Sequence, residues 1–280
     1  MYLNFYEVNL MFKTVFIYEF EKFWSKKINI LCFISIPLII LISLKFALEV
    51  NATVNTTEVI FTSTRNFPIL SLQETLITAF NVIIMIFFTL SFNEEYRKGN
   101  LRLAFTRAIS IRKLYIAKVL VIAVNVFLML LINFIICKVI GKIFLPSTNE
   151  VALFFKEGMY KNKDTIIYSL KYYFLAYLTL LAFGSIVEFF SIKCKTITAA
   201  LGFSVGFLIL NIIYMAAIMS LCNKKVILKY LSISTLYTQF AGTSYFAAGI
   251  GNVFIYEMLI VIIVFQLMCY RNFVSEDYLE

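Results

Sequence analysis

The sequence contains no histidine, and only 15% of its 280 residues are charged. Without histidine the chain lacks the commonest general base and the commonest metal-ligating side chain. It also has no GxxxxGK[ST] phosphate-binding loop, no HExxH motif and no GxSxG motif. These absences argue against a hydrolase, predict no catalytic residue and no metal site, and exclude ATP binding through a phosphate-binding loop of this chain.

Cysteine is also sparse, with five residues and no CxxC pair among them. An odd number of scattered thiols in apolar surroundings is typical of buried structural cysteines, not of a disulfide framework. The five are Cys32, Cys137, Cys194, Cys222 and Cys269.

Hydrophobic residues, in contrast, make up 61% of the chain, and the mean hydropathy is +0.88. A soluble domain of this length has no interior large enough to bury so much apolar surface. We therefore predict an all-α, polytopic membrane protein. The net charge of +9 fits basic residues beside membrane helices and anionic lipid, so membrane lipid is the expected partner and nucleic acid is not.

The hydrophobic runs predict six membrane-spanning helices, since each needs about 20 apolar residues. The whole chain, 1–280, is expected to form a single transmembrane domain, with a leader over 1–27, spans and loops over 28–270, and a short tail over 271–280. The connection 222–249 is aromatic and partly apolar, and is predicted to dip back into the membrane edge. The expected spans lie near 28–48, 70–92, 114–139, 172–191, 197–221 and 250–270.

Before the first span, apolar residues recur at steps of three and four over residues 5–24. This spacing predicts an amphipathic helix, closed by Trp24 and the Lys26-Lys27 pair. We favour a position at the membrane interface, with packing on protein as the alternative. Placing both termini in the cytoplasm puts 14 of the 25 basic residues inside, concentrated in two short connections, which weakly favours that orientation in a plasma membrane.

The densest charged stretch is 93–118, between the second and third expected spans. Glu94 and Glu95 open it, Gly99 can turn the chain, an apolar patch follows over 101–105, and Ser110 can cap a new helix. This pattern predicts a short amphipathic helix held at the membrane face by two long helices. An ordinary basic loop that sets topology is the alternative.

This stretch resembles the segment after the second helix of ABC-2 type ABC transporter permeases. The family pattern is a Glu, then Gly-Thr-Leu, an apolar run, Arg-Pro-(Ile/Val)-Ser-Arg and a late Lys. Here these elements correspond to Glu94 or Glu95, Gly99-Asn100-Leu101, Arg107-Ala108-Ile109-Ser110 and Lys118. Two positions depart from the pattern: Ala108 replaces the proline, and Ile111 stands where an arginine is common.

The resemblance implies a coupling helix that docks on a separate ATPase subunit, which would bind ATP and Mg, leaving no cofactor in this chain. It also implies a second permease chain, as a homodimer or heterodimer, and export of an antimicrobial peptide or drug. The turn with Lys193 and Lys195 would be a second inner contact. The implied ATPase contacts are Glu94, Glu95, Arg97, Gly99, Asn100, Leu101, Arg102, Phe105 and Arg107.

Two carboxylates and one pair of glycines are further candidates for a functional or a packing role. Glu257, in the last expected span, is either a substrate or cation contact or a helix-to-helix hydrogen bond. Glu188 could pair with a lysine of the 192–196 turn. Gly202 and Gly206 permit close helix approach, as at a dimer seam. Two other functions stay open: a polytopic enzyme acting on lipid, and a non-transporting membrane sensor or scaffold.

Overall fold

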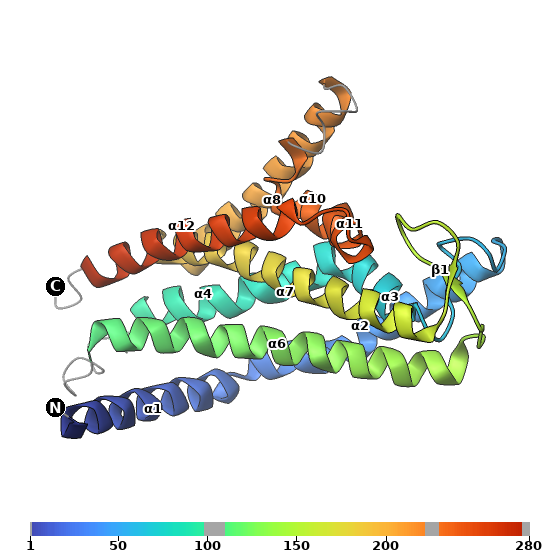
Figure 1. The fold of residues 1–280 in the computed structure, drawn as a ribbon. Coiled ribbons are helices and arrows are strands. Elements are labelled where there is room, and N and C mark those ends of the chain that lie inside the picture. Colours follow the sequence, from blue (N-terminus) through green and yellow to red (C-terminus); the bar gives the residue numbers. More distant parts are fainter. Residues whose placement is uncertain (1, 98–109, 222–229, 276–280) are drawn as a thin grey trace.

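The computed structural model describes residues 2–97, 110–221 and 230–275, which form an elongated helical bundle (Figure 1). Within these residues, six helices are long and apolar enough to cross a membrane, and each coincides with an expected span. The all-α polytopic fold is therefore confirmed. The long helices are α1 (Tyr2–Ser25), α2 (Lys27–Asn51), α3 with η1 and α4 (Phe67–Thr75, Leu76–Phe80 and Asn81–Arg97), α6 (Ile111–Phe144), α7 (Asn162–Lys193), α8 (Ile197–Leu221) and α12 (Val253–Ser275).

Helix α7 forms the centre of the bundle and packs against α4, α8, α11 and α12. Its aromatic side chains Tyr168, Tyr172 and Phe183 are almost completely buried. Gly184 allows α4 to approach closely, because a Cβ atom there would lie 2.3 Å from Cε2 of Phe88. The missing side chain is thus required by the packing of α4 on α7.

Helix α1 confirms the predicted helical leader, and it runs beside α6 (Figure 1). Val15 and Phe23 are buried against the bundle, so this side of the helix packs on protein. Ile17 and Tyr18 on the other side are exposed. The position of α1 at a membrane interface stays a prediction.

The connection before α12 is helical and packs against the bundle, and its predicted position at the membrane edge stays a prediction. Residues 235–248 form three short helices: α10 (Thr235–Tyr237), the π-helical turn η2 (Thr238–Gly242) and α11 (Thr243–Ala248). Thr238, Gln239 and Thr243 are completely buried, and α11 packs against α7. The segment is therefore part of the bundle.

The end of the bundle away from the termini carries two polar connections (Figure 1). One contains the two-residue strands β1 (Val151–Ala152) and β2 (Met159–Tyr160), which pair antiparallel. The other, before α3, is fastened to it by the Thr64 amide, which donates to the Pro146 carbonyl at 3.2 Å. This end thus joins the loops that follow α2 and α6.

The cysteine prediction holds for the described part of the chain. Cys32, Cys137 and Cys269 are buried, and all four described cysteines, including Cys194, are free thiols. Burial raises the pKa of the Cys194 thiol, outside the spans, and so disfavours a reactive thiolate. Cys222 lies outside the described residues.

Candidate coupling face

Four helix ends meet at the end of the bundle that carries both termini, which we call the coupling end (Figure 1). Here α4 finishes at Arg97, α6 begins at Ile111, α7 finishes at Lys193 and α12 finishes at Ser275. The predicted coupling segment connects the first two of these helices.

Aromatic rings join α4, α6 and α12 at the coupling end. The Phe273 ring centroid lies 5.9 Å from that of Phe92 and 5.4 Å from that of Tyr115. Phe92 and Tyr115 are 6.0 Å apart, and Tyr270 packs edge-on against Tyr115 at 5.5 Å. Such pairs contribute about 0.5–1.5 kcal/mol each beyond the burial of their area. The three helix ends therefore form one packed unit.

Asn93 joins the end of α4 to the turn between α7 and α8. Its side-chain amide donates to the Ser191 carbonyl at 3.1 Å and also to the Cys194 carbonyl. The last carbonyls of a helix lack intrahelical partners, so Asn93 acts as a cap supplied by another helix. Lys193 and Lys195, in the same turn, are exposed. The end of α4, where the predicted coupling stretch begins, therefore lies beside the turn that carries Lys193 and Lys195.

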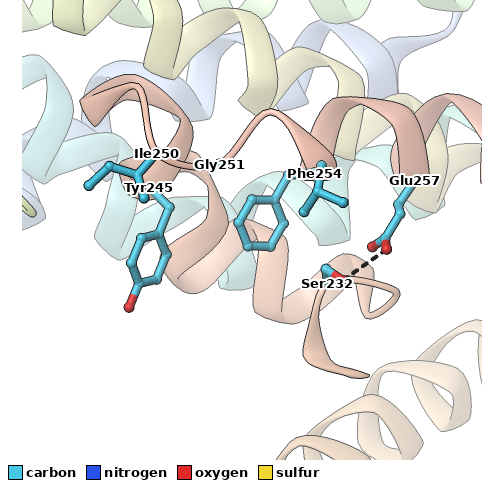
Figure 2. Close-up of a pocket in the computed structure, with 7 residues that line it drawn as sticks. Ser232, Tyr245, Ile250, Gly251, Phe254 and Glu257 are labelled. Atoms are coloured by element: carbon cyan, nitrogen blue, oxygen red, sulfur yellow. Dashed lines mark hydrogen bonds between the residues drawn. The ribbon is translucent and has the colours of Figure 1, made fainter. Parts of the chain in front are cut away.

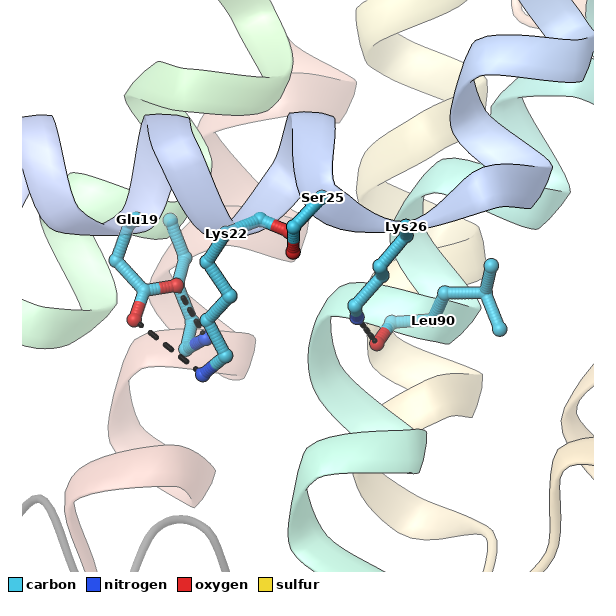
Figure 3. Close-up of polar contacts among 6 residues, drawn as sticks. Glu19, Lys22, Ser25, Lys26 and Leu90 are labelled. Carbon is cyan, nitrogen blue, oxygen red and sulfur yellow. Dashed lines mark hydrogen bonds and ion pairs between the residues drawn. The ribbon is translucent and has the colours of Figure 1, made fainter.

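A buried ion pair joins α1 to α6 (Figure 3). The Lys118 ammonium lies 2.7 Å from Oε2 of Glu19, and both side chains are at most 5% exposed. Lys22 lies 3.6 Å from Oε1 of the same carboxylate. Removing one partner of a buried pair costs about 3–5 kcal/mol, because the other charge is left uncompensated.

A second lysine on the leader reaches α4. Lys26, at the break between α1 and α2, donates from its ammonium to the Leu90 carbonyl at 2.6 Å (Figure 3). The leader is consequently attached to both helices that hold the coupling segment.

A partly buried polar chain crosses from α6 to α7 through α12. The Tyr115 hydroxyl donates to Oε1 of Gln266 at 2.8 Å, and the Gln266 amide donates to Oε2 of Glu188 at 2.6 Å. The predicted pairing of Glu188 with a lysine of the turn is therefore wrong. Glu188 is completely buried, and Lys193, five positions later, projects about 140° away around α7.

The predicted coupling residues fall into two groups. Glu94, Glu95 and Arg97 form the last turn of α4, which places them at the coupling end. Ser110 stands at the N-cap position of α6 with an extended backbone, but its side chain makes no capping hydrogen bond, so that part of the prediction is wrong. The remaining predicted contacts lie outside the described residues, namely Gly99, Asn100, Leu101, Arg102, Phe105 and Arg107.

With this geometry established, the comparisons assign a family. Residues 15–161 match the family described as ABC-2 family transporter protein. The chain belongs to the ABC-2 transporter family. The match spans more than half of the chain and runs from α1 past β2, so it includes Glu19, Asn93 and Lys118. A comparison with curated proteins found no match.

As a member of the ABC-2 family, the protein is a membrane permease component of an ABC transporter. The sequence indicated the coupling stretch and Lys118, and it singled out Lys26 only as part of the basic pair that closes the leader. Glu19, Asn93 and Gln266 were missed. One signal was available for Glu19. It lies four residues after Val15 and four before Phe23, so it interrupts an apolar stripe with a charge.

Glu257 lies far from the coupling end, near the start of α12. Its carboxylate accepts a hydrogen bond at 2.9 Å from the Ser232 hydroxyl, which precedes α10. Across residues 2–97, 110–221 and 230–275, no three carboxylate or thiol side chains gather closely enough to hold a metal ion. The candidate sites of this ABC-2 permease are therefore the coupling end and the surroundings of Glu257.

Proposed function

We propose that this permease is the membrane subunit of an exporter, driven by a separate ATPase subunit that binds ATP and Mg. In this proposal the last turn of α4 and residues 98–109 dock on the ATPase, with Lys193 and Lys195 as a second contact. The observation that carries the proposal is the family match over 15–161, which includes this stretch. The termini and the coupling end would face the cytoplasm, in the plasma membrane.

In this proposal, the contacts at the coupling end carry the movement of the ATPase to the other helices. A push on the ends of α4 and α6 acts on α12 through the Phe273 ring, on α7 through Asn93 and on α1 through Glu19. Closely packed interiors transmit such displacements because they have few voids to absorb them. The nucleotide-driven movement of the ATPase would thus shift several helices together and switch the access of the substrate cleft.

A second permease chain completes the proposed transporter. Helix α8 diverges from the bundle (Figure 1), and only 6% of its most apolar stretch is buried within the chain. Gly202 and Gly206 lie on open faces, because a Cβ atom at either would meet nothing within 4 Å. These features support a homodimer or heterodimer. The substrate, in this proposal an antimicrobial peptide or drug, would occupy a cleft between the chains.

Co-purification with an ABC ATPase subunit that is co-expressed with this chain tests the assignment. Replacing Glu94 and Glu95 together by alanine, or Leu101 by aspartate, is expected to lower ATPase recovery at least fivefold without reducing membrane insertion. The matched control is Glu150→Gln, a charge change on the connection at the far end of the bundle. Full ATPase recovery and unchanged export from both coupling variants would contradict the proposal. An activity that survives deletion of the ATPase would instead favour an enzyme or sensor.

A further inference from the structure

A small cavity of about 230 Å³ lies where the segment before α12 meets the start of that helix (Figure 2). Its wall is mostly apolar and aromatic, and its lining residues include one carboxylate and two that carry hydroxyls. The lining residues are Ser232, Tyr245, Ile250, Gly251, Val253, Phe254 and Glu257. The family match ends at residue 161, so the cavity lies outside the part of the chain that the match covers.

Two glycines shape the aromatic side of this cavity. A Cβ atom at Gly242 or at Gly251 would lie 2.8 Å from a ring carbon of Phe254, so the ring packs directly on backbone at both positions. Gly249 turns the chain between α11 and α12 with a φ of 90°, a conformation that glycine adopts without strain. Tyr245 stacks on Phe254 with ring centroids 6.2 Å apart. The two rings are thereby held in a defined position.

The carboxylate of Glu257 supplies the charge. Its Oε1 accepts the hydrogen bond from Ser232 at 2.9 Å, which orients the group (Figure 2). Its Oε2 is buried and has no hydrogen-bond partner among the described residues. Burying a carboxylate oxygen without a hydrogen-bond donor costs free energy. A ligand that brings a cation or a hydrogen-bond donor to Oε2 would remove this cost.

We propose that this cavity binds an organic ammonium group. An N–H of the ligand would donate to Oε2 of Glu257, and its alkyl part would lie against the aromatic side chains of the wall, Phe254 and Tyr245. Aromatic faces attract cations because of the ring quadrupole, and they also accept apolar groups. A bare Ca²⁺ or Mg²⁺ ion fits poorly, since one carboxylate and two hydroxyls fall short of the six or more oxygens such ions take. Anions are repelled by Glu257.

This inference goes beyond the proposed export function, because it concerns a ligand site of the permease alone. The ammonium group could come from a free amine or from the head group of phosphatidylethanolamine. Both sources carry the same chemistry, and the measurement separates them.

Saturation-transfer NMR on the full chain in maltoside micelles provides the first test, with butylammonium as the probe and butyrate as its charge-reversed counterpart. Butylammonium should bind and butyrate should not. Glu257→Gln should weaken butylammonium binding at least tenfold, whereas Glu257→Asp should retain most of it. The matched control is Glu49→Gln, which removes an exposed carboxylate at the end of α2 and should leave binding unchanged.

Binding by Glu257→Gln within twofold of the original protein, or an equal loss in Glu49→Gln, would overturn the proposal. If Glu257→Gln fails to fold, Phe254→Leu replaces it. This variant keeps an apolar side chain but removes the ring, and it should weaken butylammonium binding about fivefold. Helicity by circular dichroism confirms that each variant is folded.

Native mass spectrometry identifies the source. Retention of phosphatidylethanolamine over phosphatidylglycerol, reversed by butylammonium and lost in Glu257→Gln, would support the head group. Butylammonium binding without this lipid preference would support a free amine. No binding of either would overturn the site. Because no ATPase is present in these experiments, their failure is distinguishable from failure of the coupling assignment.

Discussion

Asn81 and Gln239 exchange two hydrogen bonds inside the bundle although they are 158 residues apart. The Asn81 amide donates to the Gln239 side-chain oxygen at 2.7 Å, and the Gln239 amide donates to the Asn81 oxygen at 2.9 Å. Each residue borders or belongs to a π-helical turn, η1 over Leu76–Phe80 and η2 over Thr238–Gly242. Such turns widen a helix locally. Here two of them pack together and are joined by a reciprocal amide pair.

Separating these two amides should destabilise the bundle. Asn81→Ala and Gln239→Ala each leave the other amide buried without its partner, and each should cost about 1–2 kcal/mol. Thermal unfolding in detergent measures the effect. In a double-mutant cycle, the double variant should lose less stability than the sum of the losses of the two single variants. Strict additivity would show that the pair contributes no coupling energy.

Lys118→Met should be among the most destabilising single changes at the coupling end. It leaves the Glu19 carboxylate buried with Lys22 at 3.6 Å as a weaker partner, and we expect a loss of about 3–5 kcal/mol. Adding Glu19→Leu should restore much of it, because the buried charge is removed. The control is Lys45→Met, whose exposed pair with Glu49 at 3.8 Å should change stability by less than about 1 kcal/mol. Equal effects of the two lysine changes would contradict a buried ion pair.

Asn93→Ala should loosen the turn between α7 and α8 without unfolding the protein. The carbonyls of Ser191 and Cys194 lose their donor, so the last turn of α7 should fray. Hydrogen exchange followed by mass spectrometry should show faster exchange in the peptide around 190–196, by about fivefold to tenfold. Asn55→Ala, on the exposed loop after α2, is the control and should leave this peptide unchanged. Unaltered exchange in Asn93→Ala would show that the cap does not hold the turn.

Gly184→Ala should destabilise the contact between α4 and α7. Its Cβ atom would clash with the Phe88 ring at 2.3 Å, and overpacking of this kind costs about 1–3 kcal/mol. Phe88→Leu in the same chain should recover part of the loss by making room. Gly202→Ala, measured on the monomeric chain in detergent, is the matched control, since no other part of the chain lies within 4 Å of its Cβ position. It should be neutral or slightly stabilising, because alanine favours helix over glycine. Thermal unfolding distinguishes these outcomes.

The sequence predicted a structural element correctly where its residues followed a recognisable repeat or formed an apolar run of characteristic length. The six spans, the helical leader and the start of α6 after Ser110 follow from apolar runs, from steps of three and four, and from turn residues. The sequence also singled out Lys118 and the Glu94–Glu95 stretch, by their order along the chain. Such features depend on the nearest dozen residues, so they can be recognised without knowing the fold.

By itself, the sequence determined that the chain is an all-α membrane protein with a charged stretch between its second and third spans. Only the tertiary structure decided which polar groups meet: Glu19 with Lys118, Asn93 with the α7 carbonyls, Gln266 with Glu188 and Asn81 with Gln239. The physical reason is that a polar side chain within an apolar helix must find a partner, but its identity depends on which helix packs alongside. The predicted coupling stretch was recognised from the order of its residues along the chain. Only the structure shows that the two helix ends it connects are packed against the rest of the bundle.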